Sequence, residues 1–322
     1  PWLRLHVAEV HLPPEHAHVG TARRLAMDAA YQRISALGRP HGIIASTDAD
    51  SQVAPDWIAS LLKAFREGTD AVGGRVLTDP MQRAALPPDV RRLYLLDVAY
   101  RLLCAECEAY LDPCPHDPWP RHHQFQGASM AVTAAAYKRA GRLPVLPVEE
   151  DVALEQALAW TGARIRHSPD VRVFTSARCQ GRALGGMATQ LETWSLASQH
   201  AQGGAEPYKV ASAADVYGRL LRRRLMRAWW IEEQQKASGS PYVGLMYPVK
   251  QPRRGSFAQF YSDLEATEPV MRDVGISEAI RALRRSLQVL RRTGPLPPLE
   301  EIQPVPILTP SVERTQRRTA AA

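Results

Sequence analysis

Two aspartates one residue apart, Asp48 and Asp50, are the residues of this sequence best suited to bind a metal ion. They follow the apolar, β-branched residues 42–47, which are typical of a buried strand, and they precede polar residues and Pro55. Side chains at positions i and i+2 of an extended backbone point the same way, and carboxylate oxygens suit Mg²⁺ or Mn²⁺ carrying a diphosphate. The alternative is a solvated turn in which the aspartates hydrogen-bond their own backbone.

A second acidic group, Glu150 and Asp151, stands directly before a segment predicted to be a helix, residues 152–160. Two interpretations are open for these carboxylates. They can belong to a site, or they can simply cap the helix, because the helix macrodipole favours negative charge at its N-terminus.

Two irregular segments also carry polar side chains. Residues 176–186 form a glycine-rich basic turn containing Arg182, and arginine in such a turn fits phosphate oxygens, although the lysine pattern of a Walker loop is absent. Residues 112–127 contain four prolines within eight residues and are predicted to be a long, stiff loop. Long loops inside a compact domain are usually functional; the alternative is a surface insertion.

The elements that position these groups alternate between strands and helices. Hydrophobic periodicity predicts strands over residues 3–10, 42–47, 71–78, 127–132, 163–167 and 171–175. It predicts helices over residues 20–30, 57–65, 87–110, 133–140, 152–160 and 187–198. The order strand, helix, strand, helix, strand at the start of the chain predicts an α/β fold with a parallel sheet and right-handed crossovers.

The basic residues of the chain are concentrated in its C-terminal third. The net charge is +7, and residues 1–208 hold 21 Lys+Arg against 22 Asp+Glu while residues 209–322 hold 19 against 11. Residues 214–233 are predicted to form an arginine-dense amphipathic helix ending in two tryptophans, and residues 277–292 a second basic helix. The first helix either contacts an anionic membrane surface or packs on the preceding domain with solvated arginines.

Composition indicates a folded chain in a reducing compartment. With 45% hydrophobic residues among 322, the sequence supports a substantial core, and it has neither a signal peptide nor an apolar run of the roughly 20 residues that a bilayer requires. Few cysteines predict a cytoplasmic protein. The alternative is a cytoplasmic protein that binds peripherally to a membrane. Cys104, Cys107 and Cys114, with histidines behind them, either bind zinc or are ordinary thiols, and Cys179 stands apart.

Three motifs, in this order along the chain, resemble the nucleotide-sugar glycosyltransferases of family two, which have the GT-A fold. They are Asp48-Ala-Asp50-Ser51 with Pro55-Asp-Trp57-Ile58; Gly127-Ala-Ser129-Met-Ala-Val132; and Glu150-Asp151 with Gly162-Ala-Arg-Ile165 and Thr175-Ser176-Ala-Arg178. The resemblance covers residues 1–195. It implies a GT-A-like, Rossmann-like mixed sheet, mainly parallel and flanked by helices, with a helical C-terminal extension. The family's usual first strand is not found, so the chain is expected to start at the second strand, without part of the donor pocket.

Applied to this sequence, the resemblance implies a role for each acidic group. Asp50 would bind Mn²⁺ or Mg²⁺ on the donor diphosphate, with Asp48 on the nucleotide sugar or the metal. Asp151, beside Glu150, would be the general base that takes a proton from the acceptor hydroxyl in an inverting transfer. Gly127 and Ala128 would let the backbone approach the sugar. We also assign Arg23 and Arg182 to donor binding.

The expected organisation and partners follow from these assignments. Residues 1–200 would be the glycosyltransferase domain, residues 201–294 a basic helical extension, and residues 295–322 a Pro-rich disordered tail. The partners would be a nucleotide-sugar donor and an acceptor that is a saccharide, a lipid or a small molecule, with peripheral membrane contact through residues 214–233 and no nucleic acid. The alternatives are a nucleotidyltransferase of similar fold and a non-catalytic basic binding protein.

Overall fold

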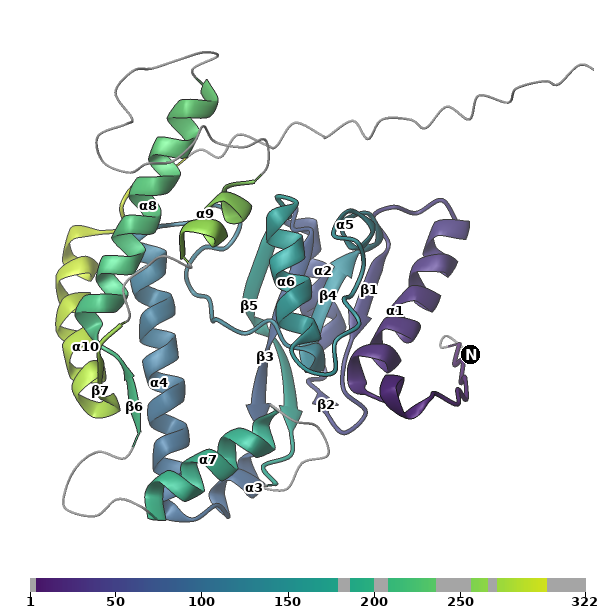
Figure 1. Ribbon diagram of the computed structural model, residues 1–322, viewed down its shortest axis with the longest axis horizontal. Coiled ribbons are helices and arrows are strands. Elements are labelled where there is room, and N and C mark those ends of the chain that lie inside the picture. The colour runs from purple at the N-terminus through teal and green to yellow at the C-terminus, as the bar shows by residue number, and fades with distance from the viewer. Residues whose placement is uncertain (1–3, 179–185, 200–207, 236–255, 266–270, 300–322) are drawn as a thin grey trace, which may run out of the picture.

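A five-stranded mixed sheet lies at the centre of the molecule (Figure 1). The computed structural model describes residues 4–178, 186–199, 208–235, 256–265 and 271–299. The strand order is β1-β4-β3-β5-β2. The strands are β1 (Ile43–Ser46), β2 (Gln52–Val53), β3 (Ala71–Thr78), β4 (Met130–Thr133) and β5 (Ile165–Thr175).

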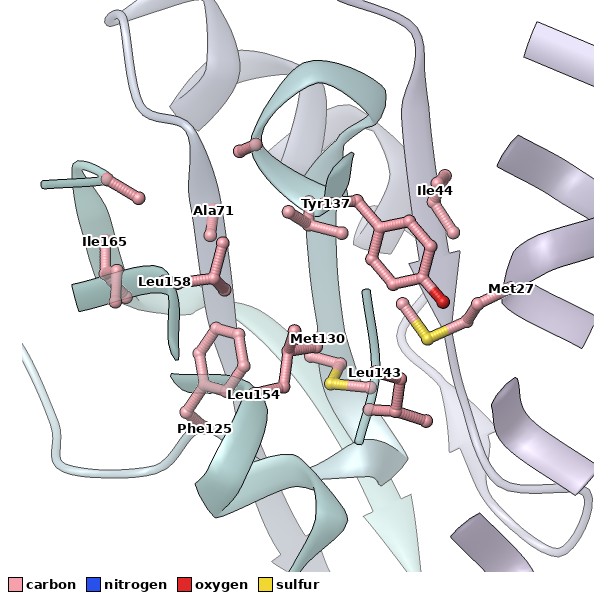
Figure 2. Close-up of a cluster of buried hydrophobic side chains, with 13 residues drawn as sticks. Met27, Ile44, Ala71, Phe125, Met130, Tyr137, Leu143, Leu154, Leu158 and Ile165 are labelled. Atoms are coloured by element: carbon pink, nitrogen blue, oxygen red, sulfur yellow. The ribbon is translucent and has the colours of Figure 1, made fainter. Parts of the chain in front are cut away.

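Alternating side chains of the strands form a core on each face of the sheet. On one face, Ala71 of β3 and Met130 and Val132 of β4 pack with α1 (Val19–Ala36), α5 (Ala134–Arg139) and α6 (Glu150–Trp160). Figure 2 shows this cluster, in which Met27 of α1 and Leu154 of α6 meet the strands. The helices α1, α5 and α6 therefore belong to a single layer.

On the opposite face of the sheet, the neighbouring strand residues Val72 and Ala131 pack with α2 (Trp57–Arg66). Residues one position apart in a strand point to opposite faces, so the pairs Ala71/Val72 and Ala131/Val132 supply both cores. Burial on both faces explains why these neighbouring positions of β3 and β4 are all apolar and do not alternate with polar residues.

Further helices lie on the side of the sheet away from α1 (Figure 1). They are α4 (Pro88–Leu111), α7 (Met187–Gln199), α8 (Ala213–Gln235), α9 (Phe257–Glu265) and α10 (Ile276–Thr293). The short elements of the chain are η1 (Pro14–His16), α3 (Pro80–Ala84), η2 (Gly127–Ser129), β6 (Lys209–Ala211) and β7 (Asp273–Gly275). Cys107 and Leu111 of α4 share one apolar cluster with Leu220 of α8 and Leu283 of α10. The C-terminal helices therefore pack directly on α4.

The basic face of α8 is turned toward the protein at several positions. Arg223 and Arg227 both bind Asp112, at 2.8 and 3.2 Å, and the indole of Trp230 is buried with Phe257 of α9. These arginines are ion-paired, which corrects the expectation that they would be solvated. Contact of α8 with a membrane surface stays a prediction. Within the described part of the chain, no helix combines the length and the apolar character that crossing a bilayer requires.

Most predicted elements are confirmed, and three are wrong. Residues 4–10 form no strand: Leu5 and Val7 are 80% and 85% exposed, so the alternating pattern buries neither of its faces. Residues 127–132 divide into the 3₁₀ turn η2 and the short strand β4. The two strands expected over residues 163–175 are one strand, β5, with an irregularity where β3 shifts register between Gly74 and Arg75.

The prediction of a mainly parallel sheet is also wrong, whereas the mixed α/β character is confirmed. Within this five-stranded sheet only β3 and β5 pair in parallel; β4 runs antiparallel to both β1 and β3, and β2 runs antiparallel to β5. The reason lies in the connection between β3 and β4. Helix α4 and the loop after it together return the chain to the edge where β3 ended, so β4 enters the sheet from that edge.

Some predictions fall on other parts of the chain. Arg182, Cys179 and residues 300–322 lie outside the described residues. The division at residues 200 and 294 also stays a prediction.

Gly20 provides a test of how tightly α1 is docked. A Cβ atom at this position would overlap the backbone carbonyl of Leu146, which cannot rotate away as a side chain can. We expect Gly20→Ala to lower the free energy of unfolding by about 1–3 kcal/mol, as overpacking of a filled site does. Urea unfolding measures the change.

The matched control is Gly186→Ala, because nothing lies within 4 Å of a Cβ built at Gly186 and its backbone is not left-handed. Equal stability of the two variants would show that α1 is not packed against the backbone of Leu146.

Candidate active site

Arg23 of α1 brings the two predicted acidic groups together. Its Nη2 lies 2.6 Å from Oδ1 of Asp48, and its Nη1 forms an ion pair with Oε1 of Glu150. The Arg23 side chain is 11% exposed and that of Glu150 only 4%, so this ion pair is shielded from water. Residues assigned separately from the sequence therefore meet at one guanidinium.

Gly127 lies directly against the guanidinium of Arg23. A Cβ atom built on Gly127 would overlap the Cζ and both terminal nitrogens of Arg23. The backbone of Gly127 is held on both sides: its N–H donates to Oδ2 of Asp151 at 2.8 Å, and its carbonyl accepts from the Ser46 hydroxyl at 3.1 Å. The group that approaches Gly127 closely in this structure is Arg23, and the expected approach of the donor sugar stays a prediction.

The antiparallel direction of β4 is what places Gly127 in this site. Asp48 follows the end of β1, whereas Gly127 precedes the start of β4, and Ser46 pairs with Met130 in the register of the two strands. Because the strands run in opposite directions, the end of one and the start of the other lie at the same edge of the sheet.

The structure distinguishes the two acids at the start of α6. Glu150 is buried and paired with Arg23, whereas Asp151 is partly exposed. The second oxygen of Asp151, Oδ1, accepts the N–H of Val152 at 2.8 Å, so both carboxylate oxygens are oriented by backbone donors. Of the two, Asp151 is the one that a ligand can reach.

Asp50 is paired with an arginine that the sequence analysis did not assign. Nη2 of Arg178, three residues beyond the end of β5, lies 2.9 Å from Oδ2 of Asp50, and both side chains are 48% exposed. Since β1 and β5 run in the same direction, both residues lie at the same edge of the sheet. The sequence did indicate the basic turn of residues 176–186, but the arginine assigned to donor binding there was Arg182.

The carboxylates of Asp48 and Asp50 fit a divalent cation that also binds a substrate phosphate. Each has one oxygen bound by an arginine, and no protein donor to the other oxygen is found among the described residues. Hard carboxylate oxygens suit Mg²⁺ or Mn²⁺, which often take only one or two protein ligands and complete their shell with phosphate and water. The described residues contain no cluster of three or more His, Cys, Asp or Glu that could hold a metal, and the metal site at Asp48 and Asp50 stays a prediction.

Ala128 has a structural position beside this site. Its side chain is 8% exposed and packs in the cluster that contains Trp57, so only its backbone faces outward. The indole N–H of Trp57 donates to the hydroxyl of Ser129 at 3.2 Å, which fixes the turn η2 from below. Trp57, which follows the Asp48 motif, thereby supports the turn that begins at Gly127.

A buried cluster around His167, behind the site, was missed by the sequence analysis. Nδ1 of His167 lies 2.7 Å from Asp117 and Nε2 lies 2.9 Å from Glu155. Burial alone would lower the pKa of His167, but the hydrogen bonds to Asp117 and Glu155 outweigh it and raise the pKa to about 9. Glu155 stands one helical turn after Asp151 on α6, so this cluster anchors the helix that carries the candidate base.

The long proline-rich loop supplies the rest of this cluster. Arg121 binds both Asp117 and Glu108 of α4, each at 3.1 Å, and Arg223 of α8 binds Glu108 at 2.6 Å. Burial would raise the pKa of Glu108, but Arg121 and Arg223 lower it to about 2. The interpretation of the loop as a surface insertion is therefore wrong for Asp117 and Arg121, which are both buried.

The cysteines before and within the loop form no zinc cluster among the described residues. Cys107 is buried, and the thiol of Cys114 lies 3.0 Å from Nε2 of His116. Burial raises the pKa of Cys107 to about 12, so it stays a neutral thiol.

Comparison with known proteins finds likeness only among solved structures, and it is distant. No protein-family model and no curated protein matches the chain. Among solved structures it is similar to the mannosyltransferase PcManGT from Pyrobaculum calidifontis, in complex with GDP-Man and Mn²⁺, at 16% identity and a TM-score of 0.30. The match covers 85% of this chain and 56% of that one, so the chain spans little more than half its length. A likeness this distant carries no argument, and the function is argued from the residues themselves.

Arg23 can be tested by removing its charge. We expect Arg23→Met to lower the free energy of unfolding by about 3–5 kcal/mol, because it leaves the buried Glu150 carboxylate without a partner. In the double variant Arg23→Met/Glu150→Gln the buried charge is gone, so part of the loss should be recovered. Urea unfolding of the four proteins of this cycle measures the coupling.

Arg33→Met is the control, since Arg33 is an exposed residue of the same helix and donates only to the Ala29 carbonyl. A double variant less stable than Arg23→Met would contradict the buried ion pair.

The cluster around His167 predicts a dependence of stability on pH. The folded-state pKa of about 9 lies above the unfolded value near 6.5, so the contribution is complete below pH 6.5 and is lost as the pH rises through 9. The difference in unfolding free energy between wild type and His167→Gln should therefore shrink by about 3 kcal/mol over that interval.

Chemical denaturation at several pH values gives this difference, with exposed His41→Gln as the control. A difference that stays constant from pH 6 to 10 would show that His167 is not protonated in the fold.

Proposed function

We propose that this chain transfers a sugar from a nucleotide-diphosphate donor to an acceptor hydroxyl, with a divalent metal and with inversion at the sugar. The observation that supports the proposal is the ion-paired unit formed by Arg23 with Asp48 and Glu150. It joins the Asp48 motif, Gly127 and the Glu150-Asp151 motif in one place at the edge of the sheet. These are the three motifs on which the resemblance to family-two glycosyltransferases rests.

Asp151 has the role of general base in this proposal. An inverting transfer needs a carboxylate that takes the proton of the acceptor hydroxyl as that oxygen attacks the sugar from the face opposite the diphosphate. Asp151 is partly exposed, and the N–H groups of Gly127 and Val152 fix its orientation. Each of its oxygens keeps a further lone pair for the proton. Glu150, buried against Arg23, acts instead as a positioning residue.

The donor end is provided by Asp48, Asp50 and the arginines beside them. Arg23 and Arg178 are within hydrogen-bond distance of these aspartates, and guanidinium groups bind phosphate oxygens as readily as carboxylates. Asp48 and Asp50 would hold Mn²⁺ or Mg²⁺, which when bound supplies positive charge to the leaving diphosphate. Arg182 and the backbone of Gly127 and Ala128 complete the proposed donor contacts.

The proposal is tested by the turnover of nucleotide sugars. Release of nucleoside diphosphate from a panel of nucleotide sugars, in the presence of Mn²⁺, is expected to fall about 10²–10⁴-fold in Asp151→Asn, the loss typical of a missing general base. Asp50→Ala and chelation of the metal are each expected to abolish turnover. Binding of the nucleoside diphosphate, measured by calorimetry, should be retained in Asp151→Asn and weakened in Asp50→Ala.

Asp170→Asn is the matched control, because Asp170 lies in β5, exposed and paired with Lys63. Turnover in Asp151→Asn within twofold of wild type would exclude Asp151 as the base, and metal-independent turnover would exclude the role of Asp48 and Asp50.

A further inference from the structure

A cavity of about 360 Å³ lies between α4, α8 and α9, and none of the residues that line it belongs to the candidate active site. Helices α4 and α8 form two of its walls, α9 contributes Tyr261 and Glu265, and the proline-rich loop contributes His123. The volume is at the lower end of the range of small-molecule sites, about 300–1,000 Å³. A cavity of this size would admit a small molecule.

Among the lining arginines, Arg219 is the one without a hydrogen-bond or ion-pair partner in the described part of the chain. The side chain is half-buried on α8, and no hydrogen bond or ion pair joins its guanidinium to any described residue. The other lining arginines are already engaged: Arg101 binds Asp97 at 2.8 Å, and Arg223 binds Glu108 and Asp112. A guanidinium with five donors and no acceptor favours an oxyanion at this position.

The charges around the cavity also favour an anion. Desolvation and then the positive charges of Arg101, His167 and Arg121 lower the pKa of His123 to about 4, so His123 is neutral at pH 7 and available for hydrogen bonding. Of the two lining carboxylates, Glu108 is neutralised by Arg121 and Arg223, whereas Glu265 is exposed and its charge is screened by solvent. Arg219 is therefore the positive charge of the cavity wall that no ion pair with a described residue compensates.

The remaining wall is apolar and aromatic. Val216 and Leu220 of α8 line it with Tyr100 of α4 and Tyr261 of α9. Tyr100 is fixed by a hydrogen bond to the Ala211 carbonyl at 3.0 Å, and Tyr261 is 7% exposed. Apolar and aromatic surface beside a single charged anchor is the usual composition of a small-molecule site.

The cavity is also held rigid. Glu108 and Arg223, which form part of its wall, are tied through Arg121 to Asp117 of the loop. These ion pairs fix α4, α8 and the loop relative to one another, so the shape that would receive a ligand exists before the ligand binds.

From these observations we infer that the cavity binds a small organic oxyanion, with its phosphate or carboxylate group on Arg219 and its body against Tyr100, Tyr261 and Leu220. The inference does not depend on the proposed glycosyl transfer. The shared chemistry of the ligand is an oxyanion joined to an apolar or aromatic group.

Calorimetry of the full chain with phenyl phosphate, benzoate and inorganic phosphate tests the inference. We expect phenyl phosphate or benzoate to bind the wild type, and the stronger of the two identifies the head group. Arg219→Met should weaken that binding about 10- to 100-fold, the loss expected for a charge-assisted hydrogen bond. Inorganic phosphate should bind more weakly than the aromatic probe, because it makes no contact with the apolar wall.

Two controls separate this cavity from other cationic positions. Arg284→Met removes an exposed arginine of α10, and Arg178→Met removes the arginine of the proposed donor site; both should bind the aromatic probe as the wild type does. Circular dichroism shows whether Arg219→Met is folded. Where it is not folded, Leu220→Trp, which fills the cavity from the same helix, replaces it and should abolish binding.

Three results would overturn the inference. They are equal affinity of wild type and Arg219→Met, loss of binding in Arg178→Met, and absence of binding by both aromatic probes. Inorganic phosphate binding as tightly as phenyl phosphate would overturn the assignment of an organic ligand.

Discussion

The ion pair between Arg23 and the buried Glu150 is the contact on which the geometry of the site depends. A carboxylate removed from water is costly unless a cation accompanies it, so α1 and α6 are bound to this relative position. The same guanidinium reaches Asp48 and covers Gly127, which must lack a side chain for the contact to exist. One arginine thereby fixes the end of β1, the turn before β4 and the start of α6.

The topology of the sheet explains why these parts are neighbours at all. β1, β3 and β5 run in one direction, and the residues after β1 and β5, Asp50 and Arg178, meet at their carboxyl edge. β4 runs the other way, so its beginning lies at that edge too. A parallel β4 would have carried Gly127 to the far edge. β4, one of the two strands that depart from the expected parallel arrangement, is thus the strand that completes the site.

The sequence predicted the parts of this site but not the contacts between them. Short motifs identified Asp48, Gly127 and Asp151 because each depends on residues close together in the chain, and periodicity located the helices for the same reason. The direction of β4 was not predicted, because it follows from the path of α4 and the proline-rich loop. The pairing of Asp50 with Arg178 and the cluster around His167 also left no signal, since each joins residues distant in sequence whose spacing has no period.

The arginines paired with Asp48 and Asp50 affect how the proposed donor would bind. In this structure each aspartate is paired with a guanidinium, but Arg23 is shared between Asp48 and Glu150 and no arginine pairs with Asp151 among the described residues, so carboxylates outnumber guanidinium groups at this edge of the sheet. A nucleotide diphosphate brings further negative charge to the same place and offers both guanidinium groups a second set of oxygen acceptors. Arg23 is the less free of the two to move toward it, because it is 11% exposed and held by Glu150, whereas Arg178 is 48% exposed at the end of β5. Arg178 is therefore suited to follow the phosphate, while Arg23 keeps Gly127 and α6 in place beneath it.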